Sequence, residues 1–185
     1  LIGTGSLAAA TLAATLPGVV TAAPPMGFPA DPFSLGVASG DPWRDSVVLW
    51  TRLAPTPLAP DGRAGMPPVK VPVHWRIARD PGMTQIVDSG WTMAAPELGH
   101  SVHVEKFGLA PDTWYWYQFK AGDALSPVGR TRTLPAQTQR TQRLRFAFVS
   151  CQDYQNGYYS AYKNLAQEDI DLVVHLGDYI YEYPE

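Results

Sequence analysis

The alternation of apolar and polar residues divides the chain into two regions of different character. Between residues 33 and 135, short apolar runs are separated by turn-forming Gly, Pro and Asp. These runs predict strands at 33–38, 46–53, 71–79, 85–90, 101–106, 114–120 and 129–134. Short strands punctuated in this way are typical of an antiparallel β-sandwich, so an all-β sandwich is the fold that we expect for residues 33–135.

A local motif in this region narrows the type of sandwich. Residues 109–117 read Leu-Ala-Pro-Asp-Thr-Trp-Tyr-Trp-Tyr, which resembles the Leu-x-Pro-x-Thr-x-Tyr-x-Tyr motif of fibronectin type III domains. The resemblance implies a fibronectin III/Ig-like sandwich with a tyrosine corner, in which the Tyr115 hydroxyl bonds to upstream backbone while its ring packs in the core. Trp114 and Trp116 then lie on the opposite face of the strand, where we expect sheet surface and no ligand site.

After a polar boundary at 136–144, the pattern changes to that of an α/β protein. Two apolar runs, beginning at Arg145 and Asp171, are rich in Val, Phe and Leu, as expected of strands buried on both faces of a sheet. Between them, residues 159–168 carry apolar side chains at helical spacing. Strand, helix and strand in this order predict one βαβ unit, with parallel strands and a right-handed crossover.

Potential metal ligands follow both strands of this unit. Cys151 and Asp153 come after the first strand, and Asp178 and Tyr181 come after the second. Ligands of open parallel sheets bind beyond the carboxyl ends of the strands, where these side chains should meet. A thiolate, carboxylates and a phenolate at one point repel one another unless a cation is present. A hard trivalent ion such as iron suits phenolate and carboxylate best.

Each of these residues also has a purely structural interpretation. Cys151 could be an inert thiol in the core, and Asp178 could cap a turn through its side chain. Tyr181 could be one packed aromatic side chain among several. His175 lies within the apolar run, so we expect it to be a core histidine with a hydrogen bond and no metal.

The sequence around these residues resembles a known family of phosphatases. Residues 177–181, Gly-Asp-Tyr-Ile-Tyr, match the Gly-Asp-x-x-Tyr motif of purple acid phosphatases and of the PhoD-like alkaline phosphatases. Together with Ser-Cys-Gln-Asp at 150–153, they resemble the PhoD type, in which Cys replaces the Asp of the usual Asp-x-His motif. The resemblance implies that Cys151 and Tyr181 ligate Fe(3+) and that Asp178 bridges it to Ca(2+). Asp153 stands where the His of the usual motif falls, so it is a possible further ligand.

The resemblance implies an enzyme, a metal-dependent phosphoric ester hydrolase. Its expected activity is that of a secreted alkaline phosphatase and phosphodiesterase, with phosphate mono- and diesters as substrates. Three alternatives stay open: a phospholipase D-like phosphodiesterase of the same family, a purple-acid-phosphatase-like enzyme with a different second metal, and a secreted sandwich that only binds. By the resemblance, residues 145–185 open a metallophosphatase domain whose further strands and ligands lie beyond Glu185. We therefore expect a fragment that is inactive by itself.

The start of the chain suggests export. Residues 1–23 are uncharged, apolar and interrupted by Pro17 and Gly18, which predicts part of a signal peptide and no stable membrane span. No charged segment precedes them, so we expect the start of the signal to be missing. The family resemblance implies a twin-arginine signal and a periplasmic, cell-surface or secreted protein. Residues 24–32 are rich in Pro and predict a linker.

Charge and cysteine content exclude several other classes. The formal net charge is −3 and no basic run occurs, which argues against nucleic-acid readout. A single Cys excludes a disulfide within the chain. We expect a monomer whose partner is a phosphate ester substrate.

Overall fold

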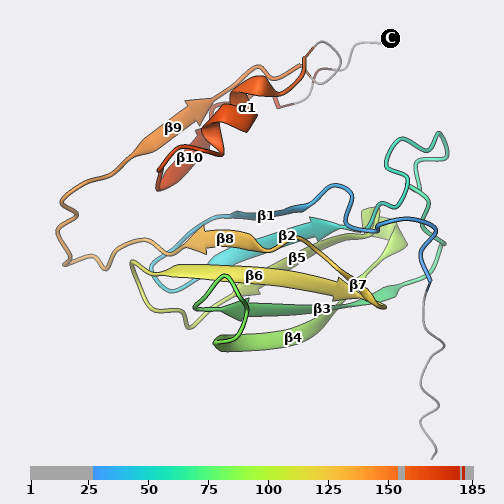
Figure 1. Ribbon diagram of the computed structural model, residues 1–185, viewed down its shortest axis with the longest axis horizontal. Coiled ribbons are helices and arrows are strands. Elements are labelled where there is room, and N and C mark those ends of the chain that lie inside the picture. Colours follow the sequence, from blue (N-terminus) through green and yellow to red (C-terminus); the bar gives the residue numbers. More distant parts are fainter. Residues whose placement is uncertain (1–26, 154–156, 180, 182–185) are drawn as a thin grey trace, which may run out of the picture.

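The chain folds into a β-sandwich followed by a small βαβ unit that lies above it (Figure 1). The computed structural model describes residues 27–153, 157–179 and 181. The predicted signal at 1–23 and the first part of the predicted linker lie outside these residues. Among the described residues, no helix has the length and apolar character needed to cross a membrane.

The sandwich consists of two antiparallel sheets. One sheet has the order β1 (Val37–Gly40), β2 (Val47–Arg52) and β5 (Ser101–Lys106). The other has the order β4 (Ile86–Ala94), β3 (Val71–Ala78), β6 (Trp114–Ala121) and β7 (Ala124–Leu125), and β8 (Gly129–Arg132) also pairs with β6. The sequence therefore predicted the fibronectin III-like architecture correctly.

The core lies between the two sheets and follows the alternation of the sequence. In β2, Leu49 and Thr51 are fully buried, and in β6 Tyr115, Tyr117 and Phe119 point inward. Successive side chains of a strand point to opposite faces, so these alternating residues make the inner face of each sheet. Val71, Val73 and Ile77 of β3 fill the space between them.

The predicted tyrosine corner is present. The Tyr115 hydroxyl accepts a hydrogen bond of 2.8 Å from the backbone N–H of Ala110, five residues upstream. Its ring is completely buried and is covered by the guanidinium of Arg79 at 4.7 Å. Trp114 and Trp116 lie on the opposite face and are half-buried, as expected.

The edges of the sandwich differ from the prediction. The segment predicted as a first strand at 33–38 begins with a turn, in which the Gly36 N–H donates to Phe33 O at 2.7 Å. Gly36 takes the left-handed conformation that this turn needs, at φ 72°, and so the strand starts only at Val37. Strand β4 continues to Ala94, beyond the predicted end at 90, and a short 3-10 helix follows (η1, Pro96–Leu98).

The second unit consists of β9 (Phe146–Val149), α1 (Ser160–Leu165) and β10 (Leu172–His175). The two strands pair in parallel, with Leu172 opposite Phe146 and His175 opposite Val149, as predicted. The helix is shorter than the predicted 159–168 at both ends. Tyr159 stands before it in a left-handed conformation at φ 52°, and after Leu165 the backbone tightens into turns, in which the Gln167 N–H donates to Asn164 O at 3.0 Å.

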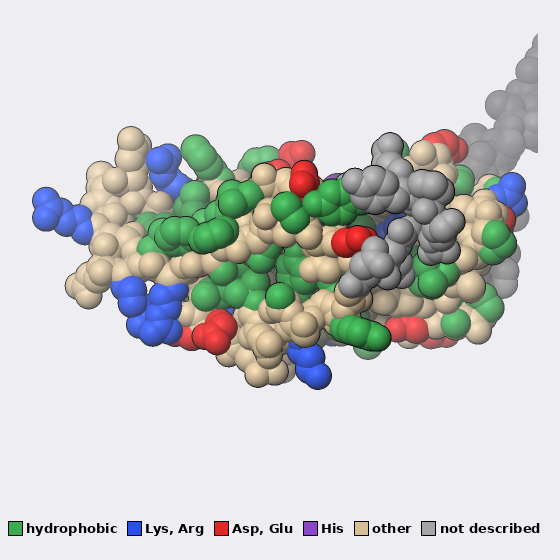
Figure 2. Space-filling model, turned by 90° about the horizontal axis from the view of Figure 1, so that it is seen from above, with side chains coloured by type: hydrophobic (Ala, Val, Ile, Leu, Met, Phe, Trp, Pro, Cys, Tyr) green, Lys and Arg blue, Asp and Glu red, His purple; other side chains and the backbone are tan. Residues whose placement is uncertain are grey.

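The expected burial of both strand faces is not found in the described residues. Phe146, Phe148 and Leu176 are 58%, 68% and 63% exposed. Figure 2 looks down on this unit and shows hydrophobic side chains at its surface. A single strand–helix–strand unit has one helix, which can cover only one face of its sheet.

Candidate metal centre

The parallel pairing of β9 and β10 continues beyond both strands and brings the two ligand segments together. The Leu176 N–H donates to Val149 O at 2.8 Å, and the Cys151 N–H donates to Gly177 O at 3.3 Å. Cys151 is thereby held by backbone against the residue that precedes Asp178. This follows from the sequence, because both segments leave the same edge of a parallel sheet.

Three of the predicted ligands meet at one carboxylate oxygen. The Cys151 Sγ lies 3.5 Å from Asp178 Oδ2, and the Tyr181 hydroxyl donates to the same oxygen at 3.0 Å. Thiol, carboxyl and phenol thus form a connected group on an exposed part of the chain. The assignment of these side chains as metal ligands stays a prediction.

The backbone at this site is strained at two of the three residues. Cys151 has φ 55° and Asp178 has φ 50°, both in the left-handed region. For residues other than Gly this region costs about 1–2 kcal/mol, and such conformations cluster at functional sites. The neighbouring Gly177, at φ 124°, adopts a conformation open only to Gly. The turns therefore aim both side chains at the same point at a cost in stability.

The electrostatics of the group favour a cation. The pKa of the Tyr181 hydroxyl is raised well above its usual range, chiefly by its hydrogen bond with Cys151, then by desolvation and by the Asp178 carboxylate. The phenol therefore keeps its proton beside these groups. A positive ion would reverse this effect, because it stabilises the anionic form of every donor. The three donors, a thiolate, a carboxylate and a phenolate, all gain from a high positive charge and therefore fit a trivalent iron.

Calcium fits these residues less completely. Calcium takes about six to eight oxygen ligands, and here Asp178 offers one carboxylate, with Asp153 as a further candidate. The backbone carbonyl of Asp153 accepts a hydrogen bond from the Gln152 side chain at 3.3 Å. In the described part of the chain, no three His, Cys, Asp or Glu side chains cluster at metal-binding distance. The predicted iron site does not count as a cluster of this kind, because its third ligand is the phenol of Tyr181.

His175 does not occupy the mid-strand position that we expected from the sequence. It is the last residue of β10 and is half-buried. The expected hydrogen bond exists, because the Gly177 N–H donates to His175 Nδ1 at 3.2 Å, and the ring packs on Tyr179 with centroids 5.0 Å apart. Its Nε2 is buried and has no hydrogen-bond partner among the described residues. The imidazole thus supports the Gly177 turn, a role that the apolar pattern did not indicate.

Comparison with known proteins places both regions in one family. The model of the PhoD-like phosphatase N-terminal domain matches residues 20–135, and that of the PhoD-like phosphatase matches residues 146–185. Alkaline phosphatase D of Bacillus subtilis (strain 168) is 58% identical over 164 residues, which are 89% of this chain and 27% of that protein. A solved structure of PhoD superposes with a TM-score of 0.82 at 57% identity, covering 85% of this chain and 30% of that one. The chain thus spans little more than a quarter of the curated relative, and it belongs to the PhoD-like phosphatase family.

Proposed function

We propose that this chain supplies the sandwich and the first metal ligands of a secreted alkaline phosphatase and phosphodiesterase. The reaction is the attack of water on the phosphorus of a phosphate mono- or diester, with release of an alcohol. The observation that carries the proposal is the convergence of Cys151 and Tyr181 on one oxygen of Asp178. Membership of a phosphatase family supports it independently. Export through a twin-arginine signal belongs to the same proposal.

Each of the three residues has a defined task in this proposal. Cys151 and Tyr181 would hold a trivalent iron, and Asp178 would share its carboxylate between the iron and a calcium. When bound, the metal ions supply Lewis acidity for the attack of water and neutralise charge on the phosphoryl oxygens. Tyr181 must give up its proton to bind, and since Cys151 and Asp178 raise the pKa of its hydroxyl, the metal has to displace that proton.

The left-handed turns contribute by fixing the ligands before the metal arrives. The Cys151 N–H is bonded to Gly177 O, so the backbone of Cys151 stays next to the residue that precedes Asp178. A preformed set of donors loses less conformational entropy when it binds an ion than a flexible one does. The strain at Cys151 and Asp178 thus lowers the stability of the folded chain, and the preformed arrangement that it maintains raises the affinity for the metal.

A visible absorption spectrum of the chain with added ferric ion tests the proposal. A phenolate bound to iron(III) gives a charge-transfer band that is distinct from the band of a bound thiolate, and we expect the phenolate band in the native chain and not in Tyr181→Phe. The matched control is Tyr179→Phe, since Tyr179 lies two residues away and is 76% exposed. This control should keep the band. If the native chain binds ferric ion without the phenolate band, or if Tyr181→Phe keeps this band, Tyr181 is not a ligand and the iron site is wrong.

A further inference from the structure

We infer that Arg132 is a positioning residue for the candidate metal centre, because it ties the β9–β10 sheet to the sandwich through Asp171. The inference rests on the proposed function in one respect only, namely that Cys151, Asp178 and Tyr181 bind a metal. Arg132 is the last residue of β8 and belongs to the sandwich. Asp171 directly precedes β10 and belongs to the βαβ unit.

The guanidinium of Arg132 bridges two carboxylates. Its Nη2 lies 2.6 Å from Asp112 Oδ1, and its Nη1 donates to Asp171 Oδ1. The Trp114 ring lies beneath it, with its centroid 5.2 Å from the guanidinium carbon. A planar guanidinium can hold two carboxylates in fixed directions, which a lysine ammonium cannot do as well.

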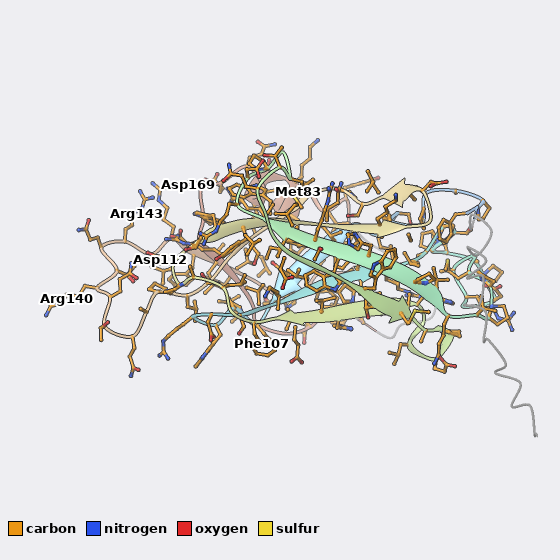
Figure 3. All side chains as sticks on the ribbon, turned by 90° about the horizontal axis from the view of Figure 1, so that it is seen from below. Met83, Phe107, Asp112, Arg140, Arg143 and Asp169 are labelled. Atoms are coloured by element: carbon orange, nitrogen blue, oxygen red, sulfur yellow. The ribbon has the colours of Figure 1, made fainter. Side chains whose placement is uncertain are left out.

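Asp112 anchors this bridge on the sandwich side. It lies within the motif of the tyrosine corner, between Pro111 and Thr113, and its own N–H donates to Leu134 O at 3.0 Å. Its second carboxylate oxygen accepts a hydrogen bond from Gln139 at 2.6 Å. In Figure 3, Asp112 lies at the same end of the molecule as Arg143 and Asp169. The bridge therefore starts from the turn before β6, next to the boundary segment.

Asp171 anchors the bridge on the side of the βαβ unit, and each of its two carboxylate oxygens accepts a different hydrogen bond. Oδ1 accepts from Arg132, whereas Oδ2 accepts from the backbone N–H of Arg145 at 3.0 Å. The Asp171 N–H also donates to Arg145 O at 2.8 Å. The same side chain thus closes the first pairing of β9 with β10 and fixes that pairing to the sandwich.

Among the described residues, the βαβ unit meets the sandwich along two hollows, the smaller of which is lined by Pro42 and Leu134 on one side and by Leu172 on the other. The larger is a cleft of about 680 Å³, lined by Ser39 and Arg130 on one side and by Tyr162 and Val174 on the other. In the described part of the chain, Arg132 to Asp171 is the side-chain hydrogen bond that crosses between the two. A two-stranded sheet is only marginally stable by itself, so this bridge should set the order of the strands that carry Cys151 and Asp178.

Hydrogen exchange of the metal-free chain tests the bridge directly. In Arg132→Ala we expect the amides of β9 and β10 to exchange about tenfold faster, as for the loss of a charged hydrogen bond, while the core of the sandwich keeps its protection. The matched control is Arg130→Ala. Arg130 lies on the same strand and covers the same Trp114 ring at 4.2 Å, and no carboxylate pairs with it among the described residues. Equal exchange of β9 and β10 in the two variants would overturn the inference.

A double variant and a spectrum separate positioning from general stability. Asp171→Asn also weakens the bond from the Arg145 N–H, so the test is the full cycle of Arg132→Ala, Asp171→Asn and the double variant. The double variant should accelerate exchange less than the two single effects added together, because both single changes remove the bond between Arg132 and Asp171, and strictly additive effects would contradict the bridge. With ferric ion added, Arg132→Ala should need a higher iron concentration than Arg130→Ala to develop the charge-transfer band. If the native chain shows no band, the proposed iron site fails, but exchange without metal still decides whether the bridge exists. If the band and the exchange are the same in both variants, the bridge fails and the iron site stands.

Discussion

The Tyr181 hydroxyl lies 3.0 Å from Oδ2 of Asp178, three residues earlier in the chain. The contact explains why the Gly-Asp-x-x-Tyr spacing carries chemical information. Asp178 leaves β10 in a left-handed turn, and three residues are enough for the chain to bring the phenol back over the carboxylate. Cys151 reaches the same oxygen from the neighbouring strand, so Asp178 is the centre of the group.

Asp178→Asn should weaken binding of ferric ion more than any other conservative change at this site. The carboxylate oxygen is the point at which both other donors meet, and an amide brings no negative charge to it. Since loss of a residue that only supports a ligand costs about 10- to 100-fold in affinity, we expect a loss at the upper end of this range or beyond. Titration with ferric ion, followed by absorbance, measures the change. Asp153→Asn serves as the comparison, and an equal loss there would mean that Asp178 is not the central ligand.

Replacement of Cys151 by Gly should stabilise the β9–β10 sheet relative to replacement by Ala. Both variants lose the thiol, but only Gly relieves the left-handed conformation at φ 55°. The expected difference is about 1 kcal/mol in the free energy of opening, measured by native-state hydrogen exchange of the β9 and β10 amides. If the two variants are equally stable, the backbone at Cys151 is not strained in solution.

Most of the fold was predictable because it depends on periodic patterns. The alternation in β2 and β6 indicated their inner faces, and the motif at 109–117 indicated that the Tyr115 hydroxyl bonds to upstream backbone, which the structure shows to be Ala110. The meeting of Cys151 with Asp178 followed from the parallel order of β9 and β10. In each case a local rule of the backbone fixes where a side chain points.

The bridge from Asp112 through Arg132 to Asp171 could not be predicted in this way. Arg132 and Asp171 are 39 residues apart, and charged residues on strand ends have no period that would reveal their partners. The same holds for the turn at Phe33, where the left-handed Gly36 overrides an apolar run that otherwise favours a strand. The bridge depends on how the two units are placed in space, and the turn depends on the conformation of the single residue Gly36; the pattern of apolar residues encodes neither.

Gly129→Ala should destabilise the sandwich, because the ring of Tyr117 folds over this glycine. A Cβ at Gly129 would lie 2.6 Å from the Tyr117 hydroxyl oxygen, much closer than van der Waals contact allows. Overpacking of this kind costs about 1–3 kcal/mol, measurable as a shift of the urea midpoint. Gly40→Ala is the matched control, since its Cβ would meet nothing within 4 Å. The expected effect there is within about 0.5 kcal/mol, and equal effects of the two changes would contradict the packing of Tyr117 on Gly129.

The stability of the sandwich should fall at alkaline pH through Tyr117. Burial raises the pKa of Tyr117 to about 12 from its ordinary value of 10.0, and a hydrogen bond with Ser39 opposes part of this shift. The folded chain therefore holds the phenol proton more tightly than the unfolded chain does. This contribution to stability is complete below pH 10 and is lost as the pH rises from 10 to 12, by about 1.4 kcal/mol for each pH unit.

Urea denaturation between pH 9 and pH 11.5 measures this loss as the difference between the native chain and Tyr117→Phe. Removing the hydroxyl also removes the bond with Ser39, but that change is a constant offset and leaves the slope against pH unaffected. Ionisation of Lys side chains and of the other Tyr side chains occurs in both proteins and cancels in the difference. Tyr179→Phe, which changes an exposed phenol, should follow the native chain throughout. If Tyr117→Phe loses stability with pH as steeply as the native chain, the Tyr117 hydroxyl is not buried in solution, and the core between β1 and β6 is looser than the structure indicates.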